Sequence, residues 1–433
     1  MFLRIFCLLV LSLNIAQTAG AAVFRAAVAK VDITPTTSQW LLGYQARQSD
    51  GIHDRLYHRI VALDDGKTTI YIVSSEIALM SPGYSDKVAQ DVQQKLGIPV
   101  QNLWWTVTHT HSAPEVGPPG VGAIFMPERY KQAKSGDSNP EYTQFFEDKL
   151  IEGLRLAKDG LEPARLGVGL GFSTANINRR GTDVDGKVIL GLNPDGPVDR
   201  QIGLIRLENL HGGLIALIAN YAMHGTVLGP ANLEISGDAP GVVADYVEQK
   251  IGAPMLFING AEGNMAPIYS VYPTPAAGHL GEFRRLLGDR ILQSNERVAG
   301  MTTDVVLTES EMTVETPLRP GLTWTSELEK YIRTLPDNTK LVRIPVRFLQ
   351  VNRDTVVWGA PVELFCEFAI DVRDHSRFPY TFYFGLLDGW LGYLPNRQAF
   401  HEGGYEPSTS PFTEQVDDDF RQGVITHISG LVR

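Results

Sequence analysis

Hydrophobic and polar positions along this chain form two periodic patterns that alternate, one typical of β-strands and one typical of amphipathic helices. Short apolar runs rich in β-branched residues end in polar or glycine-containing turns, and amphipathic stretches of helical period lie between them. The run over residues 68–74, followed by the helical pattern over 85–96, is one example. This order of elements predicts an α/β fold, with central mixed β-sheets flanked by helices.

The remaining predicted elements extend this rhythm to the end of the chain. Further strands are predicted at 103–108, 165–171, 203–207, 214–221, 255–259, 355–359 and 381–386. Further helices are predicted at 141–158, 240–250, 282–299, 363–374 and 413–431. The Pro- and Gly-rich stretches 117–122 and 269–278 are typical of loops near a site. Because no repeat and no long linker interrupts the pattern, we expect a single domain over 22–433, although the length would permit two or three.

The first 21 residues have the layout of a secretory signal peptide. Arg4 precedes an apolar run over 5–13, and small residues follow as far as Ala21. The alternative is a membrane anchor, but this run is shorter than the roughly 20 residues that span a bilayer. We therefore expect cleavage near Ala21, a mature chain without a transmembrane segment, and a secreted or periplasmic location.

Composition and cysteine content narrow the class of protein. The chain is 43% hydrophobic and 20% charged, which is typical of a soluble globular protein. A net charge of −11 makes a nucleic-acid partner a poor fit and a neutral or cationic ligand easier to accommodate. Cys7 lies in the predicted signal peptide, so the mature chain would keep the single thiol of Cys366 and no intrachain disulfide. An exported chain of this size without disulfides favours a bacterial setting.

The strongest local signal for chemistry is the segment 108–114, Thr-His-Thr-His-Ser-Ala-Pro, which follows a predicted strand. If the strand continues through it, the side chains of His109 and His111 share one face. Two imidazoles in that arrangement suit a metal ligand beside an acid/base group. Taken alone, the pair is equally compatible with exposed polar residues at a strand end.

Three further residues each follow a predicted strand: His224, Glu363 and Tyr393. Each has an ordinary structural alternative: a hydrogen-bonded histidine, a carboxylate at a helix start, and a packed aromatic ring. Ligands in open α/β folds gather outside the carboxyl ends of strands, and two histidines with one carboxylate form a common catalytic zinc site. The sequence contains no GxSxG, HExxH or GxxxxGK[ST] motif, and the acidic run 417–419 is typical of a solvated helix face.

Taken in order, these residues resemble the neutral/alkaline, non-lysosomal ceramidase family, from Val28 to about Glu406. The segments that carry the resemblance are 31–35 (Val-Asp-Ile-Thr-Pro), 43–44 (Gly-Tyr), 51–59 (Gly-Ile-His-Asp-Arg-Leu-Tyr-His-Arg), 109–114 (His-Thr-His-Ser-Ala-Pro), 178–179 (Asn-Arg), 193–194 (Asn-Pro), 224–226 (His-Gly-Thr), 236–238 (Ser-Gly-Asp), 361–363 (Pro-Val-Glu), 393 (Tyr) and 405–406 (Tyr-Glu).

The resemblance implies a zinc-dependent amidohydrolase that cleaves the N-acyl bond of ceramide or a related N-acyl lipid to a fatty acid and a sphingoid base. It implies one zinc ion per chain, completed by a water molecule and held by His109, His224, Glu363 and Tyr393. His111 would be the acid/base group that delivers a proton to the leaving amine. Arg179 and Tyr405 would steady the substrate carbonyl or the tetrahedral oxyanion. The partners implied are an N-acyl lipid or other acylated small molecule, and peripheral contact with a lipid surface.

The chain also departs from the family pattern. Ala266 and Arg180 each stand where the family has a serine, and the end at Arg433 leaves no room for the C-terminal β-sandwich domain of longer relatives. Because polar contacts to a substrate often dominate discrimination, Ala266 keeps other substrates open. The alternatives are a zinc amidase, deacetylase or esterase acting on another acylated substrate such as a glycan, and an inactive binding protein.

Overall fold

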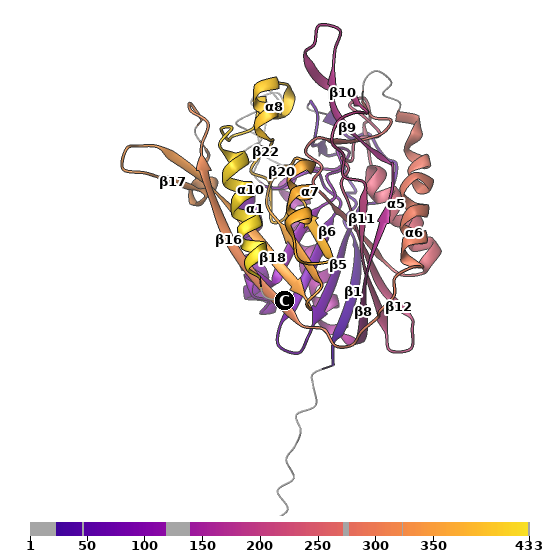
Figure 1. Ribbon diagram of the computed structural model, residues 1–433. Helices are drawn as coiled ribbons and strands as arrows, with labels where there is room; N and C mark the ends of the chain where they lie inside the picture. Colours follow the sequence, from indigo (N-terminus) through magenta and orange to yellow (C-terminus); the bar gives the residue numbers. More distant parts are fainter. Residues whose placement is uncertain (1–22, 46, 118–138, 272–276, 323, 432–433) are drawn as a thin grey trace, which may run out of the picture.

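The computed structural model describes residues 23–45, 47–117, 139–271, 277–322 and 324–431 (Figure 1). The predicted signal peptide over 1–21 lies outside these residues, as do 118–122 and 272–276 of the two predicted loops. Within the described ranges, sheets and helices form a mixed α/β structure, which confirms the predicted fold class. None of the described helices is both long enough and apolar enough to cross a membrane.

The largest sheet has eight strands, and its pairing is mixed. Its spatial order is β14 (Met255–Asn259), β12 (Leu214–Tyr221), β11 (Gln201–Asn209), β8 (Glu162–Phe172), β1 (Arg25–Asp32), β5 (Tyr57–Asp64), β6 (Thr69–Ser75) and β7 (Leu103–Val107). Strand β6 pairs with β7, and β12 with β14, in parallel, whereas the other neighbours are antiparallel. The segments that follow β7 and β12 pair with each other through a bridge between Thr110 and Gly225, so both reach one site.

A second sheet packs against the first. It consists of β16 (Leu307–Pro317), β18 (Lys340–Val351), β19 (Thr355–Gly359) and β21 (Tyr380–Phe384), with β17 (Ile332–Thr334) paired to β18. Apolar side chains of both sheets, including Ile72, Val357 and Phe382, form one buried cluster. Helices α7 (Cys366–His375) and α10 (Val416–Gly430) cover the other face of this sheet through Phe368 and Phe420 (Figure 1).

Helices also cover the larger sheet. Helices α1 (Pro82–Leu96) and α4 (Pro140–Asp159) pack in the same cluster as β1, β5 and β7. Asn139 caps α4 by accepting hydrogen bonds from the backbone N–H groups of Glu141 and Tyr142. Helices α5 (Asp238–Ile251) and α6 (Asp289–Asn295) pack on β8, β11, β12 and β14, along the opposite flank in Figure 1.

The remaining elements are short, and several of them surround the candidate site. They are β2 (Trp40–Leu41), β3 (Arg47–Gln48), β4 (Gly51–Ile52), η1 (Val100–Asn102), β9 (Asn176–Thr182), β10 (Val188–Asn193), β13 (Glu234–Ile235), β15 (Met265–Pro267), η2 (Ala277–Glu282), η3 (Arg284–Gly288), η4 (Ser326–Tyr331), β20 (Glu363–Leu364), β22 (Tyr393–Leu394), α8 (Arg397–Glu402) and α9 (Tyr405–Thr409). The predicted helix over 282–299 is wrong at both ends: a π-helical turn, η3, precedes α6, which ends at Asn295.

The predicted helix over 363–374 begins too early, and the correction matters for the site. Glu363 and Leu364 form β20, which pairs in parallel with β22 so that Glu363 lies opposite Tyr393. Phe365 is extended, and the helix α7 starts only at Cys366. Glu363 is therefore a buried strand residue and not a helix-start carboxylate.

Candidate active site

The two histidines of the His-x-His segment meet through a turn and not along a strand. Strand β7 ends at Val107, and His109 adopts a left-handed backbone conformation with φ of +62°. The strand does not continue through the segment, so the condition for the two side chains to share a strand face is not met. Their rings nevertheless lie edge to face, with 3.2 Å between the two Nε2 atoms.

Backbone pairing holds this turn beside the segment that follows β12. His111 N–H donates to the carbonyl of Gly225, and Gly225 N–H donates to the carbonyl of His109. A Cβ atom at Gly225 would lie 2.7 Å from Thr110 Cα, so only glycine allows the two backbones this close. The pairing places His224 directly beside the other two rings.

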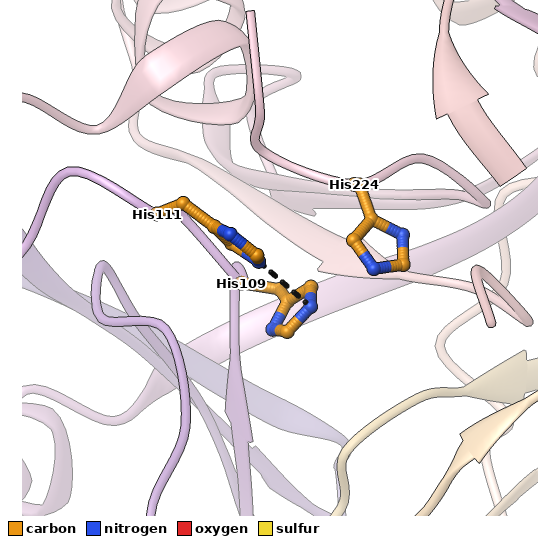
Figure 2. A group of neighbouring side chains, drawn as sticks. All are labelled: His109, His111 and His224. Atoms are coloured by element: carbon orange, nitrogen blue, oxygen red, sulfur yellow. Dashed lines mark hydrogen bonds between the residues drawn. The ribbon is translucent and has the colours of Figure 1, made fainter. Parts of the chain in front are cut away.

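Figure 2 shows the three imidazoles of His109, His111 and His224 facing one another. The ring of His224 is centred 4.6 Å from that of His109 and 5.7 Å from that of His111. Two of these rings are oriented by backbone carbonyls: Nδ1 of His109 lies 2.8 Å from Ala78 O, and Nδ1 of His224 lies 2.9 Å from Met265 O. Since a carbonyl only accepts, each Nδ1 carries the proton and each Nε2 keeps its lone pair.

Both Nε2 atoms point to the same carboxylate oxygen. Glu363 Oε2 lies 3.3 Å from His109 Nε2 and 3.0 Å from His224 Nε2. Burial opposes ionisation of Glu363, and its pKa falls well below the usual range only when positive charge lies beside the carboxylate, as on a protonated His109 or a bound cation. Burial, reinforced by Arg179, lowers the pKa of His224 to about 3, so that ring is neutral.

Tyr393 completes this group from the paired strand β22. Its hydroxyl lies 3.5 Å from His224 Nε2 and accepts a 3.1 Å hydrogen bond from Arg179. Burial raises the pKa of Tyr393 well above its ordinary value. The structure thus gathers all four residues that the sequence offered as metal ligands: His109, His224, Glu363 and Tyr393.

This group fits a metal ion on its own geometry. Glu363 Oε2 is buried and has no hydrogen-bond partner among the residues that the structure describes. Buried polar atoms in proteins are nearly always paired, so an unpaired carboxylate oxygen between two imidazole nitrogens suits a cation as its partner. Two nitrogens, one carboxylate and one phenolic oxygen are a donor set that zinc accepts.

His111 lies on the other side of the group and differs from its neighbours. Its Nδ1 is buried and has no partner within the described residues, and its ring packs edge-on against Tyr44. Gly43, with φ of +119°, lies next to the His111 ring, which fills the space that a side chain at position 43 would need. Burial, followed by His109 and His224, lowers the pKa of His111 well below its ordinary value. His111 is therefore a neutral imidazole whose Nε2 faces His109 and whose unpaired Nδ1 lies on the side of Gly43.

Arg179 and Tyr405 lie beside these residues. Arg179, on β9, donates to Tyr393 Oη and, at 2.8 Å, to His224 Nε2. Tyr405 is 38% exposed and its ring centre lies 5.6 Å from that of Tyr393, which puts it at the rim. All seven residues offered by the sequence therefore lie in one region, in which His111 is half-buried, Tyr405 is exposed and the other five are buried.

Comparison with known proteins identifies the family. Residues 24–264, more than half of the chain, match the family model for the N-terminal part of neutral/alkaline non-lysosomal ceramidase. The chain belongs to this family. The resemblance carried by the sequence segments is thereby confirmed.

The ceramidases that it resembles are distant and longer. Over 336 residues the chain is 26% identical to the neutral ceramidase of Pseudomonas aeruginosa, covering 72% of this chain and 48% of the relative. It is 28% identical over 235 residues to neutral ceramidase A of Dictyostelium discoideum, covering 51% of this chain and 31% of the relative. The chain thus spans about half the length of the first of these ceramidases.

Two solved ceramidase structures share the fold. The crystal structure of neutral ceramidase from Pseudomonas aeruginosa superposes with a TM-score of 0.73 at 17% identity, covering 93% of this chain and 74% of that chain. A structure of a ceramidase complexed with C2 superposes with a TM-score of 0.75 at 16% identity and the same coverage. At these identities the likeness shows the fold of this ceramidase family member, and not its substrate.

Three charged residues near the group are not among the predicted site residues, although Glu406 lies in a segment that carries the family resemblance and Arg180 departs from the family pattern. Glu406, which is 1% exposed, accepts from Arg179 Nε at 2.8 Å and from Arg180 Nη1 at 2.9 Å. Arg180 also donates to Glu402 and to the carbonyl of Gly403. Arg180 replaces the family serine, and it ties β9 to the segment that carries Tyr405. The third residue, Glu262, is fully buried.

We expect Arg180→Ser, which restores the family residue, to weaken the attachment of the segment with Tyr405 to β9. Removing the guanidinium leaves one oxygen of buried Glu406 unpaired, at a cost of about 2 kcal/mol in the free energy of unfolding. The segment with Tyr405 then gains mobility, so kcat should fall by severalfold. Chemical denaturation and turnover assays on Arg180→Ser measure both effects, and Arg353→Ser, at an exposed arginine, is the control. Unchanged stability and turnover in Arg180→Ser would contradict the attachment role.

Proposed function

We propose that this chain is an exported, zinc-dependent amidase whose catalytic domain spans 22–433 and that hydrolyses ceramide or a related N-acyl lipid. The products are a fatty acid and a sphingoid base or other amine. One observation carries the proposal: the unpaired oxygen of Glu363 between the Nε2 lone pairs of His109 and His224. Membership of the ceramidase family supports the amide bond as the target.

The proposed metal ligands are His109, His224, Glu363 and Tyr393. A zinc ion bound there supplies a hydroxide nucleophile near neutral pH and polarises the scissile carbonyl. The two histidines are already oriented for this task, because backbone carbonyls hold their Nδ1 protons. Binding of the ion requires Arg179 to give up its 2.8 Å hydrogen bond to His224 Nε2, so that this lone pair can face the metal.

The remaining residues act on protons and charge. In amide hydrolysis water adds to the carbonyl carbon, the C–N bond breaks, and the nitrogen must receive a proton before it leaves. His111 holds and transfers that proton, since its ring lies next to His109 with 3.2 Å between the two Nε2 atoms. Arg179, fixed by Glu406, and Tyr405 at the rim stabilise the negative charge that develops on the carbonyl oxygen.

One observation favours a second candidate substrate class. Ala266 on β15 is 1% exposed and pairs with Ile177 of β9, two residues from Arg179. A serine there would present a hydroxyl close to the site, and its absence removes a polar contact that a substrate headgroup could use. The second candidate is therefore amide or ester hydrolysis of another acylated molecule, such as an N-acyl glycan, by the same metal centre.

The deciding experiment measures fatty-acid release from a short-chain ceramide by the protein over 22–433. The expected result is release that disappears on removal of the metal by a chelator and returns on addition of zinc. Release that survives complete metal removal would contradict the proposed mechanism. Bound zinc without release would move the substrate assignment to a panel of N-acyl glycans and esters, and zinc binding without turnover on any of them would indicate a binding protein.

A further inference from the structure

Glu262 lies close to two of the candidate ligands, His109 and Glu363, and the backbone holds it there. It follows β14 in a tight turn in which Met265 N–H donates to the carbonyl of Glu262 at 2.7 Å. The next residue, Gly263, donates its N–H to the carbonyl of Leu364, so the turn is tied to β20. Because Glu363 also belongs to β20, the two glutamates are anchored to the same short strand.

The side chain of Glu262 has no protein partner that accounts for it. It is fully buried, and neither Oε1 nor Oε2 has a hydrogen-bond partner within the described part of the chain. A buried carboxylate is costly without a counter-charge, and a buried carboxylic acid still needs an acceptor for its proton. Its neighbour Glu363 has an unpaired oxygen as well. Two acidic side chains thus converge with three unpaired oxygens between them.

The distances allow one cation to satisfy these oxygens. Ligand atoms of His109, Glu262 and Glu363 all lie within 4.8 Å of one another. Two ligand atoms on the same zinc ion, each about 2.2 Å from it, are at most about 4.4 Å apart. The three atoms are therefore close enough for one ion to bind them all after the side chain of Glu262 shifts toward the other two.

The fold also makes room for this carboxylate. A Cβ atom at Gly385 would lie 2.9 Å from Glu262 Oε2 and 2.4 Å from the carbonyl oxygen of Gly260. Any side chain at 385 would therefore push Glu262 out of its place. Gly385 is held there by donating its N–H to the carbonyl of Asn259, so the space is a fixed part of the structure.

We propose that Glu262 is a further ligand of the metal ion, which two carboxylates, Glu262 and Glu363, hold together with His109 and His224. This inference rests on the proposed metal centre and deepens it. A second carboxylate adds a negative charge and a hard oxygen donor, which raises the relative affinity for ions such as Mn²⁺ over zinc. The site should therefore tolerate Mn²⁺ better than a site with Glu363 alone.

The test compares wild-type protein, Glu262→Gln and Glu262→Ala, each loaded with zinc or with Co²⁺. X-ray absorption at the zinc edge should show one nitrogen or oxygen neighbour fewer in Glu262→Ala. The Co²⁺ absorption bands should intensify in that variant, since Co²⁺ with fewer ligands absorbs more strongly. Glu262→Gln, of the same size, should bind zinc at least about 10-fold more weakly and should lose more affinity for Mn²⁺ than for zinc.

The control is Glu147→Gln, a buried carboxylate on α4 outside the metal group, which should leave spectra and affinities unchanged. Unchanged neighbour number and Co²⁺ spectrum in both Glu262 variants would overturn the ligand role, even if affinity fell. Wild-type protein that binds no metal would overturn the proposed metal centre as well. Metal in the wild type with unchanged spectra in the variants would overturn only the role of Glu262.

Discussion

Replacement of Glu363 by glutamine is expected to abolish tight metal binding and, with it, nearly all hydrolysis. Glu363 supplies an oxygen that faces both His109 Nε2 and His224 Nε2, and the amide of a glutamine side chain carries no charge to hold a cation there. Loss of a residue that merely orients a ligand costs about 10- to 100-fold in metal affinity, so loss of a ligand should cost more than about 100-fold. The expected fall in kcat/KM is more than about 1,000-fold, because the ion supplies both the nucleophile and the carbonyl polarisation.

Metal stoichiometry after dialysis and fatty-acid release, measured on the same preparation, check this expectation. The substitution Glu363→Gln keeps the size of the side chain, so β20 and its pairing with β22 should persist. Thermal melting of the metal-free proteins would verify that. A Glu363→Gln protein with full zinc content and full turnover would rule out the proposed metal centre.

Replacement of His111 by alanine is expected to separate proton transfer from metal binding. His111 lies 3.2 Å from His109 through their Nε2 atoms, whereas the oxygen of Glu363 that would hold the ion lies against His109 and His224. The zinc content should therefore stay near one per chain. Positioned acid/base groups contribute about 100- to 10,000-fold, so kcat should fall within that range while KM changes little.

A second variant, His111→Asn, distinguishes loss of the proton carrier from loss of packing. The His111 ring supports Tyr44 and leaves no space beside Gly43, so alanine also removes packing. Asparagine fills more of this space but cannot take up a proton near neutral pH. Both variants should lose similar activity if proton transfer is the role of His111. Intact turnover in either variant, with zinc still bound, would assign proton transfer to another group.

Much of the fold follows from local pattern. Strands β12, β14 and β19 have the predicted bounds, because each is a continuous apolar run with nearly every residue buried. Strands β16 and β18 were missed, since one of their faces is exposed and carries charged residues such as Glu311 and Arg343. Strand β1, with three alanines and a lysine, has too weak a strand propensity to stand out.

For the candidate site, too, some features follow from local sequence and others only from long-range packing. The identity of the proposed donors is local information: His109, His224, Glu363 and Tyr393 each follow a predicted strand, and the resemblance to the ceramidase family selects them as ligands. Their mutual geometry is not local. The left-handed turn at His109 and the β20–β22 pairing decide which atoms face one another, and neither has a periodic signal.

The amino-acid sequence by itself determined the fold class and the family, and it offered the histidine, carboxylate and tyrosine side chains that we propose as metal ligands. Only the tertiary structure decided that Arg180 donates a hydrogen bond to buried Glu406. It alone also placed the carboxylates of Glu262 and Glu363 close together, each with oxygens that have no hydrogen-bond partner within the described residues. The physical reason is that burial and hydrogen-bond satisfaction depend on every segment packed around a group. Glu262 and Glu363 lie far apart in the chain, and their shared environment exists only after the segment following β14 and β20 have come together.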